Sequence, residues 1–151
     1  MSINGNFLAY ALVMLVAGLG IPVLAALNGG LGARLQNPAL ATTILFGVAL
    51  VLSVACLAAS GNFPRAMPVA APWHLYLGGV FVVFYVLSVT WIAPRFGVGN
   101  AIAFVLLGQL ASMAAIDHFA LLGAPRNPVD AGRFFGLALM AIGVFFAVRR
   151  A

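Results

Sequence analysis

Acidic residues are scarce in this sequence, and lysine is missing. Two aspartates are the only acids among 151 residues, and all seven basic residues are arginines. Charged residues make up 6% of the chain and hydrophobic residues 65%, whereas about a quarter of the residues in a soluble domain are charged. This balance excludes a soluble globular protein and indicates an integral membrane protein.

Several patterns that catalysis requires are also absent. The sequence has no Walker loop, no HExxH motif, no Cys/His cluster with metal-ligand spacing and no Ser/His/Asp set. Its single cysteine, Cys56, cannot form a disulfide within the chain. We therefore expect neither an enzyme nor a protein that holds a metal or another cofactor.

The arginines give a formal net charge of +5, which in a soluble protein would suggest nucleic-acid binding. Here they are dispersed between apolar runs, a distribution typical of anchors at the membrane surface. The expected surroundings are a lipid bilayer, with no nucleic-acid partner.

Five apolar runs are long enough to cross the hydrocarbon core of a bilayer, which takes about 20 helical residues. The connections between them are rich in Gly, Pro and Asn and predict turns. The first run is longer than a signal-peptide core and lacks a small-residue cleavage pattern, so we expect it to be retained. Asp130 precedes the fifth run as a predicted N-cap. The sequence thus predicts an all-α integral membrane protein with one transmembrane domain over residues 1–151 and spans at about 7–27, 38–60, 73–92, 100–122 and 129–148.

An odd number of spans places the two chain ends on opposite sides of the membrane. Three arginines then lie on the side of the N-terminus, namely Arg65, Arg126 and Arg133. Four lie on the other side, namely Arg34, Arg95, Arg149 and Arg150. Because basic loops favour the cytoplasm, this balance gives little instruction about orientation. Either other signals fix one orientation, or copies insert both ways and pair head to tail.

Polar side chains within the apolar runs are candidates for function because their burial in lipid is costly. Gln109 lies near the middle of the predicted fourth span, where it could hydrogen-bond a substrate or another helix. Asn28 follows the first span, in which Gly18 and Pro22 predict a helix break. Such a break exposes carbonyl groups that transporters use to bind substrates. The alternative is an ordinary proline kink with Asn28 as a C-terminal cap.

Asp117 and His118 form the other polar pair. At about 1.5 Å per residue they lie about 7–9 Å inside the end of the predicted fourth span. One hypothesis is that they satisfy backbone groups at a corner of the bundle or pair with Arg126 or Arg133. The other is a gate or proton site, because a carboxylate beside an imidazole in a medium of low dielectric constant titrates close to neutral pH.

Aromatic residues in the third span have two interpretations. Phe81, Phe84 and Tyr85 follow helical spacing, which suits either a packing stripe or a wall for a planar ligand. Trp73 and Trp91, near opposite ends of the span, are typical of interfacial belts. We include Phe84, Tyr85 and Trp91 among the candidate substrate-binding residues.

Glycines recur on one face of the fifth span, at Gly132, Gly136 and Gly143. Small residues at this spacing allow close helix packing in membranes. The packing partner is either another helix of the same chain or, as we slightly favour, a second copy of the chain.

Three stretches carry a resemblance to a known family. They are GIPVLAALNGGLGARLQNPALATTILFGVAL, APRFGVGNAIAFVLLGQ and DHFALLGAPRNPVDAGRFFGLALMAIGV. They resemble the YdcZ-type members of the drug/metabolite transporter superfamily, which are small bacterial inner-membrane proteins. The family pattern has Gln two residues after the proline of the first helix and Gly after DHF, whereas this sequence has Leu24 and Ala120. These departures put in doubt a polar role at the first position and a tight turn at the second.

The resemblance implies a five-helix half of a ten-helix transporter, completed by an antiparallel homodimer. Small multidrug exporters of that superfamily use a Glu in the first helix to exchange protons for cations, and the first span here has no acid. We therefore expect a secondary transporter of a small polar metabolite, neutral or anionic, which binds at Gln109 and Asn28. A dual-topology ion channel or a membrane scaffold without transport activity is the alternative.

Overall fold

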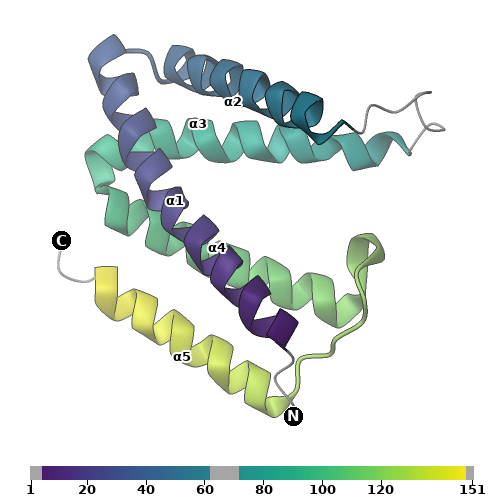
Figure 1. The fold of residues 1–151 in the computed structure, drawn as a ribbon. Helices are drawn as coiled ribbons and strands as arrows, with labels where there is room; N and C mark the ends of the chain where they lie inside the picture. The colour runs from purple at the N-terminus through teal and green to yellow at the C-terminus, as the bar shows by residue number, and fades with distance from the viewer. Residues whose placement is uncertain (1–4, 62–71, 149–151) are drawn as a thin grey trace. The chain divides into compact units, whose positions relative to one another are not determined.

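The computed structural model describes residues 5–61 and 72–148 (Figure 1). Arg65, Arg149 and Arg150 lie outside these ranges. Every regular element described is a helix, and five helices are long and apolar enough to cross a membrane, which confirms the predicted class. They are α1 (Gly5–Leu35), α2 (Pro38–Ser60), α3 (Gly78–Phe96) with a preceding 3-10 turn η1 (Trp73–Leu77), α4 (Val98–Phe119) followed by η2 (Leu121–Gly123), and α5 (Ala131–Val148).

The chain divides into two compact units at the end of α3. The first unit is Met1–Arg95 and the second is Phe96–Ala151. Each unit has its own internal packing.

The first helix of the first unit corrects two predictions. It continues without interruption through Gly18, Pro22 and the Asn28-Gly29-Gly30 segment to Leu35, so the predicted break at Gly18 and Pro22 is wrong, and so is a cap at Asn28. Proline removes one backbone donor, but ending the helix there would expose several more unsatisfied groups to lipid. The helix therefore tolerates Pro22 rather than breaking at it.

The glycines that suggested a turn instead allow close packing of α1. A Cβ atom on Gly29 would lie 3.4 Å from Pro94 Cγ, and one on Gly32 would lie 2.9 Å from Thr90 Cγ2, both on α3. Without these side chains the α1 backbone can approach α3 closely. Gly29 and Gly32 are therefore helical residues in a helix–helix contact.

The turn from α1 to α2 uses two local motifs in succession. Asn37 N–H donates to Gly32 O at 3.1 Å and Gln36 N–H to Ala33 O at 3.3 Å, the bonding pattern of a Schellman motif. Asn37 then caps α2, because its Oδ1 accepts from Leu40 N at 3.0 Å, and Pro38 occupies the first helical turn. The predicted start of the second span at residue 38 is confirmed.

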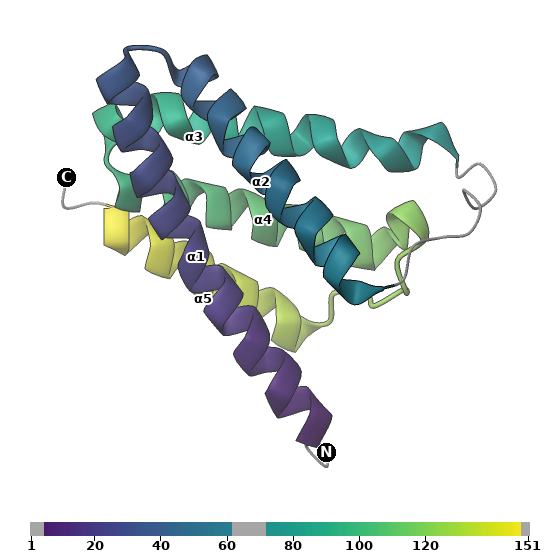
Figure 2. The ribbon, with the colours of Figure 1, turned by 45° about the horizontal axis from the view of Figure 1, so that its top comes forward.

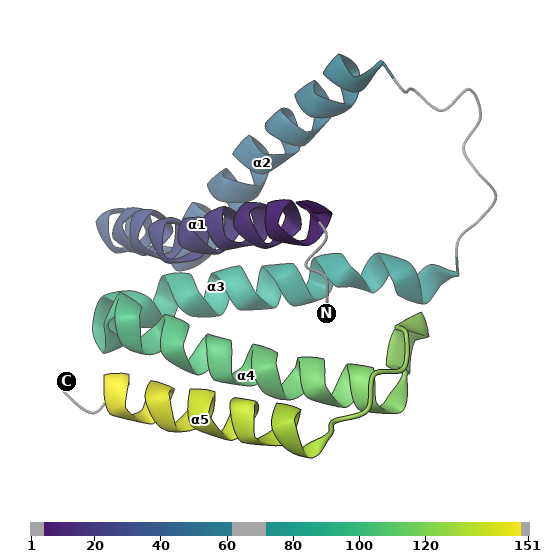
Figure 3. The ribbon, with the colours of Figure 1, turned by 60° about the horizontal axis from the view of Figure 1, so that its bottom comes forward.

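Buried contacts of the first unit concentrate near this turn. Figures 2 and 3 show α2 and α3 diverging from the end where α1 turns into α2. The third helix runs to Phe96, beyond the predicted end at residue 92, with Pro94 inside it. The buried residues of the unit are Ala25, Asn28, Gly29, Gly32, Ala41, Thr42, Val86, Val89, Thr90 and Ala93.

The second unit is a helical hairpin. Gly97, with φ of 89°, precedes α4, so the helix begins at Val98 rather than at the predicted residue 100. It ends at Phe119 rather than at 122, because Ala120 adopts the left-handed conformation with φ of 51°. The tight turn that Ala120 put in doubt therefore forms without glycine, at some cost in strain.

The fifth helix begins two residues later than predicted, at Ala131. Asp130 Oδ1 accepts from Arg133 N at 2.7 Å, which confirms the predicted N-cap. This bond fixes the start of α5 relative to the turn that precedes it.

Candidate functional site

A buried polar pair joins α1 to α3 in the first unit. Asn28 Nδ2 donates to Thr90 Oγ1 at 2.6 Å, and Thr90 Oγ1 donates to Val86 O at 2.7 Å. Because the threonine hydroxyl has a single hydrogen, its bond to Val86 leaves Oγ1 to accept from the asparagine amide. The orientation of the Asn28 amide follows from this order of donors.

The pair lies deep among apolar residues. The exposed fractions are 4% for Asn28 and 2% for Thr90. Asn28 Oδ1 has no hydrogen-bond donor among the described residues, so it remains an acceptor for a guest molecule. The sequence had indicated Asn28 but not Thr90, because threonine in a membrane helix commonly bonds only its own backbone.

Two hollows adjoin this pair, one at each partner. Thr90 lines a hollow of about 530 Å³, and Asn28 lines one of about 270 Å³. The hydrogen bond therefore connects a wall of one hollow to a wall of the other. The larger hollow is lined by Gly32, Ala33, Gln36, Pro38, Thr90, Trp91, Pro94 and Arg95, and the smaller by Leu24, Leu27, Asn28, Leu31 and Leu45.

Arg95 and Trp91 form one wall of the larger hollow. Arg95 Nη1 donates to Trp91 O at 2.6 Å, and the guanidinium carbon lies 5.5 Å from the centre of the Trp91 ring. The cation–π contact and the hydrogen bond hold the guanidinium over the ring. Trp91 therefore lines the larger hollow, and its role in substrate binding stays a prediction.

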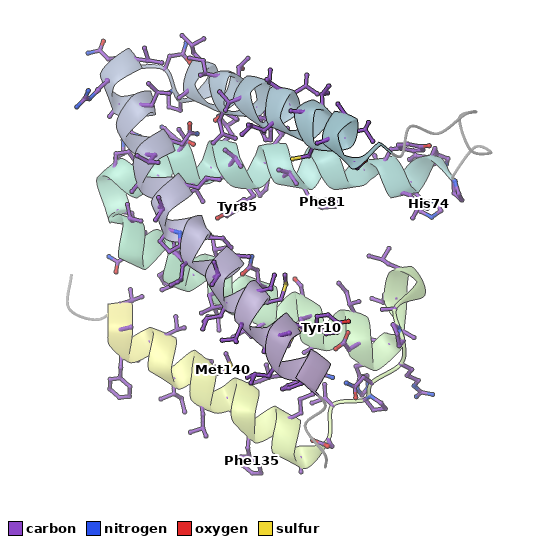
Figure 4. All side chains as sticks on the ribbon, viewed as in Figure 1. Tyr10, His74, Phe81, Tyr85, Phe135 and Met140 are labelled. Carbon is purple, nitrogen blue, oxygen red and sulfur yellow. The ribbon has the colours of Figure 1, made fainter. Side chains whose placement is uncertain are left out.

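Two further buried hydroxyls have no partner among the described residues. They are Thr42 Oγ1 on α2 and Tyr85 Oη on α3; Figure 4 labels Tyr85. A hydroxyl left unpaired in an apolar environment is costly unless water or a ligand satisfies it. Neither Tyr85 nor Phe84, which is 72% exposed, lines either of the two hollows.

In the second unit, Asp117 and Arg133 tie α4 to α5. Arg133 Nη2 forms an ion pair with Asp117 Oδ2, and Nη1 donates to Asn127 O at 2.9 Å. Asn127 N in turn donates to Asp117 O at 2.9 Å. We call these three residues the hairpin clamp. They match the hypothesis of an arginine partner for Asp117.

His118 contacts the same turn. Its Nδ1 accepts from Val129 N at 3.2 Å, so the other ring nitrogen, Nε2, carries the N–H. The imidazole also borders an apolar groove of about 450 Å³ along α4 and α5. His118 therefore satisfies a backbone donor, as the structural hypothesis for the pair required.

Gln109 lies on the exposed surface of α4. Its amide has no hydrogen-bond partner within residues 5–61 and 72–148. The structure therefore brings Asn28 and Trp91 to one unit and leaves Gln109 in the other, with its amide free to bind.

The glycine face of α5 is open within its unit. A Cβ atom on Gly136 or Gly143 would meet no atom within 4 Å, and one on Gly132 would meet only Asp130 Oδ1, at 3.5 Å. Figure 4 shows Phe135, 65% exposed, projecting from the side of α5 that faces away from α4. The glycines therefore do not serve the packing of α5 on α4.

Within the described residues, five helices of membrane-spanning length in a chain with so few charges define a multi-pass membrane protein. The chain belongs to the family described as "Putative inner membrane exporter, YdcZ", whose model matches residues 9–146. The resemblance drawn from the sequence motifs is thus confirmed, together with the location in the inner membrane. The family description favours transport over enzymatic catalysis, and within the described residues no group of three His, Cys, Asp or Glu could hold a metal. No curated protein and no solved structure matches the chain.

Proposed function

We propose that this protein is a secondary transporter of a small polar organic metabolite, neutral or anionic. It works by alternating access in an antiparallel homodimer whose copies insert in opposite orientations. Asn28 and Gln109 hydrogen-bond the substrate, Tyr85 and Trp91 complete its site, and Asp117 and His118 act near one membrane face as a gate.

The buried pair of Asn28 and Thr90 is the observation that carries this proposal. A hydrogen-bonded amide and hydroxyl are expensive to place among membrane helices, and here they adjoin two hollows rather than a sealed core. The free acceptor on Asn28, which lines the smaller hollow, suits a polar ligand. A cation is disfavoured, because residues 1–95 contain no acid.

Four features support a dimer of opposed copies. The described residues hold five helices of membrane-spanning length, an odd number, and the arginines are divided nearly evenly between the two sides. The glycine face of α5 is free for a close helix contact. The exposed amide of Gln109 would gain a partner in a dimer or from a substrate.

Flux through proteoliposomes tests the proposal. A thermal-shift screen of the purified protein against a metabolite library first identifies a ligand, because ligands that bind the folded state raise its apparent stability. We expect saturable uptake of that ligand, stimulated by the same ligand inside the vesicles. Currents far above carrier rates would identify a channel, and absence of flux with retained dimerisation would identify a scaffold.

Asn28→Ala provides the site-specific test. It removes the amide from the wall between the hollows, and we expect a fall in uptake of at least tenfold. The matched control is Ser53→Ala on α2, because Ser53 bonds only Leu50 O of its own helix, at 2.9 Å. Equal uptake by both variants would contradict the placement of the substrate at Asn28.

A further inference from the structure

Among the described residues, those that line the larger hollow of the first unit carry a single charge, and that charge is positive. Arg95 is the only ionisable residue among them, and no acid occurs anywhere in residues 1–95. Arg95 forms no ion pair among the described residues. The hollow therefore presents an uncompensated cation to whatever enters it.

The Arg95 guanidinium is held in place and keeps N–H donors that are not used in that contact. One of its N–H groups reaches Trp91 O, and the Trp91 ring lies against its face. A guanidinium has five N–H donors in a fixed plane, which matches the two oxygens of a carboxylate. Because Trp91 fixes the position of Arg95, little side-chain freedom is lost when an anion binds.

Gln36 supplies the second feature of the hollow. It adopts φ of 51°, a left-handed conformation at the end of α1 where glycine is the usual residue. A non-glycine residue held in this region is strained, and such strain concentrates at functional sites. Gln36 lines the same hollow as Arg95, and its side chain has no hydrogen-bond partner among the described residues. Its amide therefore has donors left for a ligand, at a position where glycine would fold with less strain.

We infer that this hollow is a carboxylate subsite, in which Arg95 and Gln36 bind the carboxylate of a small organic anion and Thr90 contacts its neutral remainder. The inference rests on the proposed function, because it narrows the transported substrate from neutral or anionic to carboxylate. The hollow of about 530 Å³ falls within the range of about 300–1,000 Å³ that is usual for small-molecule sites. A phosphate of an anionic lipid shares this oxyanion chemistry and is the competing source.

Three probes of equal shape and different charge test the inference. Benzoate, benzamide and benzamidine carry negative, zero and positive charge on nearly the same framework. Trp73→Phe leaves Trp91 as the sole tryptophan, since the chain has two, so its fluorescence reports on the hollow. In nanodiscs of phosphatidylcholine we expect saturable binding of benzoate, at least tenfold weaker binding of benzamide and no binding of benzamidine.

Variants of matched charge assign the effect to Arg95. We expect Arg95→Gln to weaken benzoate binding at least tenfold, Arg95→Lys to restore part of it, and Gln36→Gly to weaken it while raising thermal stability. Arg34→Gln is the control, because Arg34 carries the same charge near the same turn but does not line the hollow. Equal losses in Arg34→Gln and Arg95→Gln would overturn the inference, and so would the absence of any Arg95-dependent preference for benzoate up to its solubility limit.

The lipid source is separated by a second set of nanodiscs that contain phosphatidylglycerol. Unchanged benzoate affinity supports the carboxylate subsite, whereas benzoate binding at least tenfold weaker than in phosphatidylcholine assigns the hollow to a lipid phosphate instead. Failure of this inference is distinguishable from failure of the transporter proposal. Saturable uptake of a neutral metabolite without benzoate binding would refute only the subsite, and benzoate binding without flux of any ligand would refute only the transporter.

Discussion

Gly32 determines how closely α1 can approach α3, and thereby where Asn28 meets Thr90. It is buried, and an added Cβ would meet Thr90 Cγ2 at 2.9 Å and the Pro38 backbone at 3.4 Å. Real Cβ atoms do not approach other carbons so closely without a shift of the neighbours. The absence of a side chain at Gly32 is therefore a condition for the buried hydrogen bond one turn earlier in α1.

We expect Gly32→Ala to lower the free energy of unfolding by about 1–3 kcal/mol, the usual cost of overpacking. In the Thr90→Ser background, which removes Cγ2 and keeps the hydroxyl, the same substitution should cost less than half as much. A double-mutant cycle measured by denaturant unfolding in detergent reports this coupling. Equal costs in both backgrounds would show that the Thr90 methyl group is not what limits the contact.

Gly30 is the internal control for this experiment. It lies in the same helix, but a Cβ there would meet nothing within 4 Å. Alanine at an open helical position stabilises by about 0.5–1 kcal/mol relative to glycine. Opposite signs for Gly30→Ala and Gly32→Ala would establish that packing, rather than helix propensity, decides the effect at Gly32.

Sequence reasoning reached Asn28 but not its surroundings. A lone polar residue in an apolar run is visible in the sequence because its burial is costly. Thr90, Thr42 and Arg95 gave no such signal, since threonine bonds its own helix and arginine at a helix end is an ordinary interfacial anchor. Their roles depend on which helix faces which, and that information requires the fold.

At the scale of elements, the hairpin clamp determines the geometry of the turn between α4 and α5. The Asp117 carboxylate forms an ion pair with Arg133, and the Asp117 carbonyl oxygen accepts a hydrogen bond from Asn127 N–H. Arg133 also donates to Asn127 O. The carboxylate and guanidinium are partly buried, with 27% and 21% of the side chains exposed. Such a pair loses less strength to solvent screening than a fully exposed one.

We expect Asp117→Asn to lower the free energy of unfolding by about 1–3 kcal/mol, because it removes a hydrogen bond to a charged partner. Asp130→Asn is the matched control, since asparagine caps a helix nearly as well as aspartate. If Asp117 is only structural, transport per folded molecule will stay at the wild-type level at every pH. A changed pH dependence of uptake in Asp117→Asn would instead assign it to a proton-linked gate.

The helices themselves were predictable to different degrees. The predicted second span was right at both ends, because the proline at its start and the glycine after its end are unambiguous signals of helix boundaries. Span one was wrong at its end: Pro22 and the glycines after Asn28 resemble a break and a turn, but α1 continues to Leu35. The glycines serve the contact with α3, and a sequence pattern cannot separate a glycine that bends a chain from one that allows close packing.

At the scale of the whole molecule, the distribution of arginines bears on how the chain is oriented in the membrane. Arg65, Arg126 and Arg133 are expected on the side of the N-terminus, and the other four arginines on the opposite side. Since about equal numbers of arginines favour each orientation, small changes in charge should make one orientation predominate. This makes the proposed dual topology testable with substitutions that lie away from the candidate site.

Two variants whose arginine and lysine distributions favour opposite orientations test the dual topology. Ser2→Lys with Arg149→Ser and Arg150→Ser leaves four basic residues on the N-terminal side and two on the other, whereas Arg65→Ser with Arg126→Ser leaves one and four. A reporter fused at Ala151 should be active on both sides of the membrane for the wild type and on one side only for each variant.

Transport is the decisive readout of the same two variants. If the functional unit is an antiparallel dimer, each variant expressed alone should lose at least nine-tenths of its uptake, because it lacks opposed partners. Co-expression should restore uptake, since copies of opposite orientation can then pair across the open glycine face of α5. Full activity of either variant alone, with its reporter on one side, would refute the antiparallel dimer and leave the family assignment and the carboxylate subsite standing.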